Sequence, residues 1–169
     1  MTLVLGGAGS GKSAYAERLA GQSARPRHYI ATAQAFDDEM AAKIERHREA
    51  RGPDWITHEA PLDISAPLAS IGEDAVCLLD CATLWLSNVL LAERVLDVEI
   101  AKFLDALDTA SAPLIVVSNE VGMSVVPEYK LGRRFRDAQG KLNQAIAARA
   151  DHAVLVIAGL PQILKGSGP

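Results

Sequence analysis

Short, nearly unbroken apolar runs alternate along this chain with longer segments in which apolar residues recur every three or four positions. The short runs predict strands at residues 2–5, 28–33, 75–80, 114–118 and 153–158. Continuous hydrophobicity is typical of strands that are buried on both faces of a parallel sheet. The longer segments predict helices at residues 12–23, 37–51, 83–94, 97–109 and 133–149. This alternation predicts an α/β fold, a mainly parallel sheet flanked by helices.

The composition narrows the class of protein. The chain has 169 residues, 49% of them hydrophobic, so we expect a single well-packed domain spanning residues 1–169. Lys and Arg number 17 against 21 Asp and Glu, which gives a net charge of −4, and aromatic residues make up 5%. Because nucleic-acid-binding proteins are usually basic and often stack bases on aromatic rings, we expect no nucleic-acid partner.

The apolar runs and the cysteines suggest where the protein works. The runs are shorter than the roughly 20 residues that cross a bilayer, and the N-terminus lacks the basic segment of a signal peptide, so we expect no membrane partner. Cys77 and Cys81 are spaced C-x-x-x-C within an apolar run, which matches neither a zinc pair nor a redox motif. Two buried thiols fit a reducing compartment, and we expect a cytoplasmic protein.

A glycine-rich segment directly after the first strand carries the strongest chemical signal. It fits the pattern G-x-x-x-x-G-K-S and consists of Gly6, Gly7, Ala8, Gly9, Ser10, Gly11, Lys12 and Ser13. Such a segment between a strand and a helix directs successive backbone N–H groups at phosphate oxygens. Lys12 would neutralise the β- and γ-phosphates, and the Ser13 hydroxyl would bind Mg²⁺. Asp80, at the end of the third strand, is the expected second Mg²⁺ contact, the alternative being a helix cap.

A histidine lies on the apolar face of the helix predicted at residues 37–51. Met40, Ile44 and His47 are spaced i, i+4 and i+7 and therefore share one face. Four cations lie around the histidine: Lys43, Arg46, Arg48 and Arg51. A neutral imidazole beside bound phosphates can attack phosphorus and form a phosphoramidate. On this segment alone a packing role remains the stronger alternative.

The remaining histidines and the downstream polar segments carry weaker signals. No comparable cation cluster surrounds the histidine at a strand start, the one in an expected loop or the one before the last strand: His28, His58 and His152. Asn119 and Glu120 follow the fourth strand, at the edge where open α/β sheets bind ligands, although a polar turn is the alternative. Three arginines, Arg133, Arg134 and Arg136, open a predicted helix against its dipole, which suggests an anionic substrate or a subunit contact.

Taken in order, these segments resemble those of one enzyme family, the bifunctional adenosylcobinamide kinase / adenosylcobinamide-phosphate guanylyltransferases of cobalamin biosynthesis. The resemblance covers essentially the whole chain. It rests on residues 6–13, 29–33, 37–40, 44, 47–48, 55, 59, 80–81, 83–86, 118–123, 126–128, 133–137, 140–144 and 158–161. The phosphate-binding pattern alone is common to many families, whereas the ordered set is specific.

The resemblance implies two reactions. A nucleoside triphosphate phosphorylates the hydroxyl of adenosylcobinamide; GTP then guanylylates a histidine, here His47, which passes GMP to adenosylcobinamide phosphate. The donor of the first step is GTP or ATP. Besides the glycine-rich segment, the implied nucleotide contacts are Ala31, Thr32, Ala33, Arg48, Glu49, Ala50, Arg51, Glu59 and Asp80. The resemblance also implies a P-loop NTPase fold like the core of recombination ATPases, and a homotrimer.

Two positions depart from the family pattern. Gly9 stands where the family usually has Arg, which bears on nucleotide preference, and Ser124 stands where it usually has Gly, in the turn after Asn119 and Glu120. Two other functions remain open from the residues alone. One is a small-molecule kinase in which His47 is structural, and the other is a nucleotide-switched module that is not an enzyme.

Overall fold

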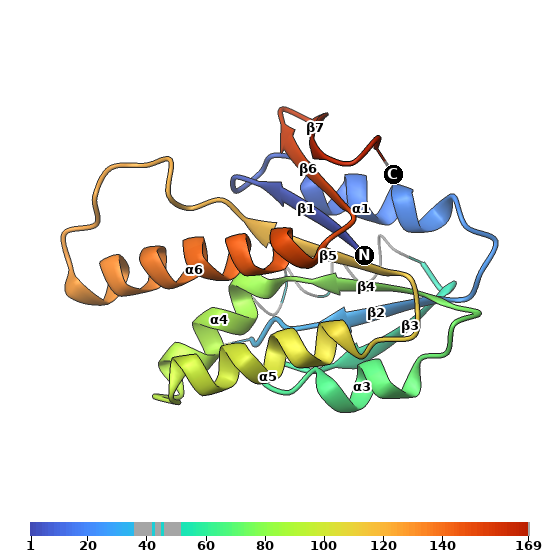
Figure 1. Ribbon diagram of the computed structural model, residues 1–169, viewed down its shortest axis with the longest axis horizontal. Helices are drawn as coiled ribbons and strands as arrows, with labels where there is room; N and C mark the ends of the chain where they lie inside the picture. The colour runs from blue at the N-terminus through green and yellow to red at the C-terminus, as the bar shows by residue number, and fades with distance from the viewer. Residues whose placement is uncertain (36–41, 43–44, 46–51, 169) are drawn as a thin grey trace.

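The computed structural model describes residues 1–35, 42, 45 and 52–168. Its centre is a seven-stranded sheet in the order β3-β2-β4-β5-β1-β6-β7 (Figure 1). The strands are β1 Thr2–Gly6, β2 Arg27–Ala31, β3 Trp55–Glu59, β4 Val76–Asp80, β5 Leu114–Asn119, β6 His152–Ile157 and β7 Leu160–Lys165. All neighbouring strands are parallel except β6 and β7, which form an antiparallel hairpin. The predicted α/β fold with a mainly parallel sheet is confirmed.

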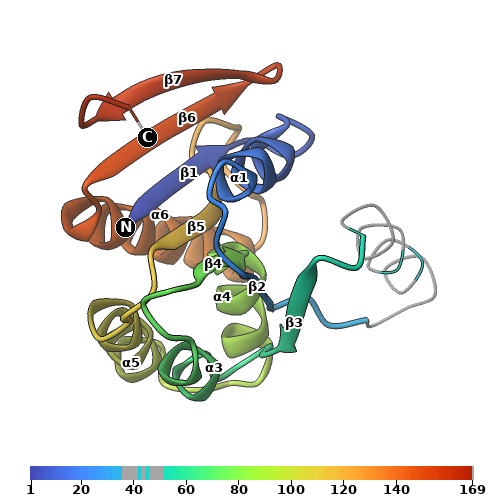
Figure 2. The ribbon, with the colours of Figure 1, turned by 90° about the vertical axis from the view of Figure 1, so that its right-hand side faces the viewer.

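Among the described residues, helices cover the two faces of the sheet unequally (Figures 1 and 2). On one face lies α1 Lys12–Gly21, and on the other lie α3 Ser65–Ser70, α4 Ala82–Leu91, α5 Leu96–Asp108 and α6 Lys130–Arg149. The strands explain this arrangement because their side chains alternate between two apolar clusters. In β1, Leu3 and Leu5 belong to the cluster under α3 to α6, whereas Val4 packs with Ala16 of α1. Burial on both sides is why these strands are continuously hydrophobic.

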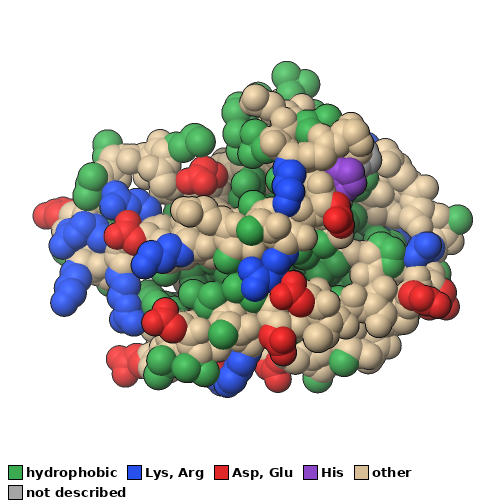
Figure 3. All heavy atoms as spheres, viewed as in Figure 1, with side chains coloured by type: hydrophobic (Ala, Val, Ile, Leu, Met, Phe, Trp, Pro, Cys, Tyr) green, Lys and Arg blue, Asp and Glu red, His purple; other side chains and the backbone are tan. Residues whose placement is uncertain are grey.

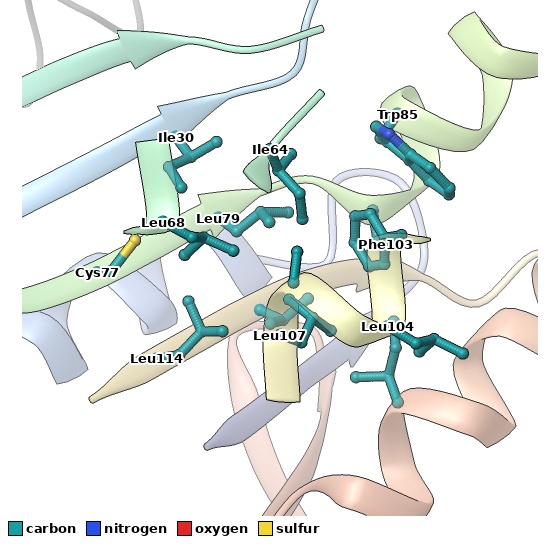
Figure 4. Close-up of a cluster of buried hydrophobic side chains, with 14 of the residues drawn as sticks. Ile30, Ile64, Leu68, Cys77, Leu79, Trp85, Phe103, Leu104, Leu107 and Leu114 are labelled. Atoms are coloured by element: carbon teal, nitrogen blue, oxygen red, sulfur yellow. The ribbon is translucent and has the colours of Figure 1, made fainter. Parts of the chain in front are cut away.

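The larger cluster lies between the sheet and α3, α4 and α5 (Figure 4). Trp85 of α4 and Phe103 of α5 pack with ring centroids 4.2 Å apart. The indole N–H of Trp85 donates to the carbonyl of Leu62 at 2.9 Å, so the buried ring leaves no polar atom unpaired. No helix in the described part of the chain is long and apolar enough to cross a membrane.

Three elements escaped prediction because they lack a strong apolar period. Strand β3 is an edge strand with only partial burial, α3 has six residues, and every residue of β7 is exposed. The expectation that His58 lies in a loop is wrong, because His58 pairs with Ile30 as part of β3. The expectation that His152 precedes the last strand is also wrong, because it begins β6, which β7 follows.

Some element boundaries also differ from prediction. Strand β2 ends at Ala31 rather than at residue 33. The N–H of Thr32 makes the last bond to β4, to the carbonyl of Asp80 at 3.3 Å, and its hydroxyl then bonds the backbone of Cys81. Helix α6 begins at Lys130, so Arg133 does not open it as predicted. The Arg133 guanidinium instead donates to two carbonyls that precede the helix. Of the helix predicted at residues 37–51, only residues 42 and 45 are described, and both are helical.

Candidate nucleotide site at the carboxyl edge of the sheet

The glycine-rich segment, residues 6–13, connects the end of β1 to the start of α1 and is called the phosphate loop below. The N–H of Ser10 donates to the carbonyl of Gly7 at 3.2 Å, which closes a tight turn. Helix α1 begins at Lys12, so the unpaired N–H groups of its first turn face the same space as the loop. This combination of loop amides and a helix N-terminus is suited to binding phosphate.

Glycine is required in the loop where other backbone approaches it. A Cβ on Gly6 would lie 2.4 Å from the Ser10 hydroxyl oxygen and 2.7 Å from the carbonyl oxygen of Val156. Gly11 has a left-handed φ of +89°, and a Cβ there would lie 3.1 Å from the Cα of Gly159. Gly159 also donates its N–H to the carbonyl of Ser10 at 2.8 Å. The turn between β6 and β7 therefore packs directly on the phosphate loop.

The Lys12 side chain has no carboxylate partner among the described contacts. Its ammonium group donates to the carbonyl of Gly7 at 3.2 Å, within the loop itself. Its charge also acts on the thiol of Cys81, whose pKa it lowers slightly against larger opposing effects. Lys12 therefore lies between the loop and the end of β4, where its charge can neutralise a bound phosphate.

Sheet register brings the predicted contacts from separate strands to one edge. Ala31, at the end of β2, pairs with Glu59 of β3 on one side and with Asp80 of β4 on the other. On β1 and β5, Gly6 pairs with Asn119. Because the strands are parallel, all of these residues lie at the carboxyl edge, which is where open α/β sheets bind ligands.

Thr32 fixes the turns that follow β2 and β4. Its buried hydroxyl donates to the carbonyl of Cys81 and accepts from the N–H of Cys81, both at 2.8 Å. The hydroxyl is therefore occupied within the protein. The backbone groups are occupied as well, because the N–H donates to the carbonyl of Asp80 and the carbonyl accepts from the side-chain amide of Asn88 at 2.7 Å. Both donors of Thr32 are thus already used within the protein. Ala33 follows it and is partly exposed.

Both cysteines are buried and free, as predicted. Burial raises the pKa of the Cys77 thiol to about 12. Burial, together with the nearby charge of Asp80, raises the pKa of the Cys81 thiol to about 11. Cys81 caps α4, its sulfur accepting the N–H of Leu84 at 3.4 Å. At neutral pH these thiols are protonated, which argues against nucleophilic or zinc-binding roles.

The predicted nucleophile and its neighbours, His47, Arg48, Glu49, Ala50 and Arg51, lie outside the described residues.

The arginines of α6 are described: Lys and Arg side chains gather over the first half of this helix (Figure 3). Arg136 pairs with Asp137 at 3.0 Å, and the loop before the helix exposes Met123, Val125 and Tyr129.

The sequence did not predict that a group of polar residues is buried together behind this edge, although three of the four lie in the segments that carry the family resemblance. Thr83 of α4, Ser118 of β5 and two residues of α6, Gln139 and Asn143, are each at most 5% exposed. The available signal was that Gln139 and Asn143 stand next to Leu142 in the apolar stripe of α6, where a polar residue needs a buried partner.

Comparison with known proteins shows the family to which the chain belongs. The family model for cobinamide kinase / cobinamide phosphate guanyltransferase matches residues 2–164. The chain belongs to this family. Relatives include a bifunctional adenosylcobalamin biosynthesis protein of Pseudomonas aeruginosa, 49% identical over 167 residues, which are 97% of this chain and 96% of the relative. A Salmonella typhimurium protein of the same description is 40% identical over 98% of this chain and 99% of its own length.

Members of this family combine kinase and guanylyltransferase functions in one chain, so this protein is a bifunctional enzyme, as the resemblance implied. Solved structures support the fold alone. The RadB recombinase has a TM-score of 0.52 and 17% identity, covering 91% of this chain and 72% of that chain. A protein of Pyrococcus horikoshii OT3 has a TM-score of 0.58 and 7% identity, covering 99% and 86%. The expected likeness to recombination ATPases is confirmed.

Proposed function

We propose that the phosphate loop binds the triphosphate of GTP, or of ATP in the kinase step, and that adenosylcobinamide and its phosphate are the acceptors. The observation that carries this proposal is the convergence of the loop, Glu59 and Asp80 at one sheet edge in a chain of this family. The backbone amides of residues 7–13 and the Lys12 ammonium would hold the phosphates. Ala31 and Ala33 would lie beside them, at the end of β2.

The residues at the edge fit Mg²⁺. Ser13 lies in the first turn of α1 and Asp80 ends β4, and both are partly exposed. A hydroxyl and a carboxylate are hard oxygen ligands, and Mg²⁺ in nucleotide sites usually takes few protein ligands because phosphates and water supply the rest. When bound, Mg²⁺ neutralises charge on the phosphates.

In the kinase step the substrate hydroxyl oxygen forms a bond to the γ-phosphorus while the bond to the β-phosphate oxygen breaks. The hydroxyl proton passes to solvent, and a nucleoside diphosphate is released. Little covalent chemistry is needed from the protein, because most of the catalysis is positioning and charge stabilisation. Lys12 and the loop amides supply that stabilisation.

In the second reaction we assign the nucleophile to His47. One imidazole nitrogen forms a bond to the α-phosphorus of GTP, and pyrophosphate leaves. A phosphate oxygen of adenosylcobinamide phosphate then attacks the same phosphorus, which frees the imidazole and yields adenosylcobinamide-GDP. The arginines beside His47, Arg48 and Arg51, would hold phosphate oxygens and keep the imidazole neutral by raising the cost of a further positive charge.

The proposed function includes an oligomeric state and a cellular location. We expect a single catalytic domain per chain from the length and composition, and a cytoplasmic enzyme from the two buried thiols. The family resemblance implies a homotrimer. Sedimentation of the purified protein across a range of concentrations measures the assembly. A species with three times the chain mass of 18.0 kDa supports the trimer, and a monomer at all concentrations contradicts it.

Labelling with GTP that carries radioactive phosphorus at the α-position tests the nucleophile. We expect label that survives denaturation and alkali but is lost in acid, as for a phosphoramidate. His47→Ala should abolish it, whereas the matched control His152→Ala, at the opposite end of the sheet, should not. An unlabelled wild type, or equal label on His47→Ala, would refute guanylylation of this residue. A kinase step that persists in His47→Ala separates the two reactions.

A further inference from the structure

Strand β5 extends beyond the strand that pairs with it on one side. The last residue of β4, Asp80, pairs with Val117 of β5, and the chain then turns into α4. On the other side, β1 still accompanies β5, and the N–H of Glu120 donates to the carbonyl of Gly6 at 3.1 Å. Successive residues of a strand direct their backbone N–H and C=O groups to opposite sides. Those of Asn119 therefore point to the side on which β4 no longer runs.

Side chains from two helices replace the missing strand there. The hydroxyl of Thr83, on α4, accepts the N–H of Asn119 at 2.7 Å. The side-chain amide of Asn143, on α6, donates to the carbonyl of Asn119 at 3.0 Å. Both backbone groups of Asn119 are thus paired although β4 no longer runs beside them, which avoids the cost of burying them unpaired.

A buried chain of hydrogen bonds fixes the two supporting side chains. Ser118 donates to the carbonyl oxygen of the Asn143 side chain at 2.7 Å, and Gln139 donates to both Ser118, at 2.9 Å, and Asn143, at 2.8 Å. Since the Ser118 proton is committed to Asn143, the 3.3 Å contact between Thr83 and Ser118 has Thr83 as its donor. Each hydroxyl therefore has one donor role and at least one acceptor role, which defines a single arrangement.

We propose that Thr83 and Asn143 are positioning residues for phosphoryl transfer. They hold Asn119, whose neighbour Glu120 holds Gly6, the first residue of the phosphate loop. A hydroxyl on α4 and an amide on α6 thereby set where the loop and the end of β5 stand relative to one another. This inference rests on the proposed function, in which the loop carries the transferred phosphate.

The matched substitutions Thr83→Val and Thr83→Ser test this role. Valine keeps the shape but removes the hydroxyl, and serine restores it. We expect Thr83→Val to lower kcat of the kinase step by about 10-fold or more, because small misplacements of reacting groups are costly. The KM for nucleotide should change by less than about threefold, because the loop amides and Lys12 remain. Thr83→Ser should recover kcat to within about twofold of wild type.

Loss of stability is separated from loss of positioning by Val89→Ala, on the same helix. Val89 is fully buried in the core cluster and lies near the C-terminal end of α4, whereas Thr83 lies at the start of the helix. All variants are assayed well below their melting temperatures. If Val89→Ala lowers kcat as much as Thr83→Val does, or if Thr83→Ser is as slow as Thr83→Val, the positioning role is refuted.

The variant Lys12→Ala distinguishes a failure of the positioning role from a failure of the proposed function. Kinase activity that survives Lys12→Ala overturns the assignment of the phosphate loop, whatever the Thr83 variants do. Kinase activity that is lost in Lys12→Ala but unchanged in Thr83→Val overturns only the positioning role. Loss in both, with recovery in Thr83→Ser, supports both.

Discussion

Gly11→Ala tests the packing of the phosphate loop against the turn between β6 and β7. A residue other than glycine at a left-handed φ, here +89°, costs about 1–2 kcal/mol. The new Cβ would also lie 3.1 Å from the Cα of Gly159, and this backbone neighbour must move by a few tenths of an ångström. We expect a loss of about 2 kcal/mol in the free energy of unfolding, which corresponds to a melting temperature about 4–8 °C lower for a domain of this size.

The same substitution of glycine by alanine at another position should raise the free energy of unfolding instead of lowering it. A Cβ on Gly140, in the middle of α6, meets no atom within 4 Å. Gly140→Ala should therefore stabilise the protein by about 0.5–1 kcal/mol, because alanine loses less conformational freedom in a helix. Urea and thermal unfolding of the two variants, followed by circular dichroism, measure both effects.

Nucleotide binding gives this prediction a second readout. The N–H of Gly159 donates to the carbonyl of Ser10 in the loop, so displacing the turn should also disturb the loop amides. We expect GTP to raise the melting temperature of Gly11→Ala less than it raises those of wild type and Gly140→Ala. A Gly11→Ala protein that unfolds at the wild-type temperature, or a Gly140→Ala protein that loses as much stability, would refute the reasoning.

Three further expectations concern the core and the titrating groups. Phe103→Ala, which removes the ring packed on Trp85, should cost about 3–5 kcal/mol in urea unfolding, and a cost below about 1 kcal/mol would contradict the packing described. Alkylation of Cys81 at pH 8 should be at least about 100-fold slower in the folded protein than in urea, because burial raises the pKa of its thiol to about 11. Equal rates in the two states would contradict this, because they would show that the thiol is accessible and ionised. Burial and the neighbouring His58, whose ring nitrogen lies 2.9 Å away, lower the pKa of His28 from 6.5. Below pH 6.5 the unfolded chain therefore binds more protons at this position than the folded protein does. The free energy of unfolding should decrease as the pH falls through 6.5. His28→Gln should accordingly lose less stability than wild type between pH 7.5 and 5.5, as measured by urea unfolding, and an equal loss would contradict the assignment.

Much of the fold follows from local patterns. Strands β1, β2, β4, β5 and β6 were predictable because each is buried on both faces, which forces continuous hydrophobicity. The phosphate loop was predictable because its chemistry comes from consecutive residues, with glycines where other backbone approaches. Helix α5 was placed within one residue at each end by its apolar period.

Elements without such a period depend on their neighbours. Edge strand β3 forms because β2 offers it a row of backbone partners, and β7 forms because it folds back on β6. Their own sequences carry mixed or exposed side chains, so no local pattern marks them as strands. The pairing that places His58 in a strand is likewise a property of two segments rather than of one.

By itself, the sequence determined the five strands that are buried on both faces, the phosphate loop and the family, because these depend on neighbouring residues and on an ordered set of motifs. Only the tertiary structure decided that Asp80, Glu59 and Ala31 share one edge, since strand register is set by pairing between distant segments. It also decided that Thr83 and Asn143 support Asn119. The hydrogen-bond partner of a buried polar side chain is often distant in the sequence. The role of such a side chain can therefore be assigned only from the folded structure, where the two groups lie within hydrogen-bonding distance.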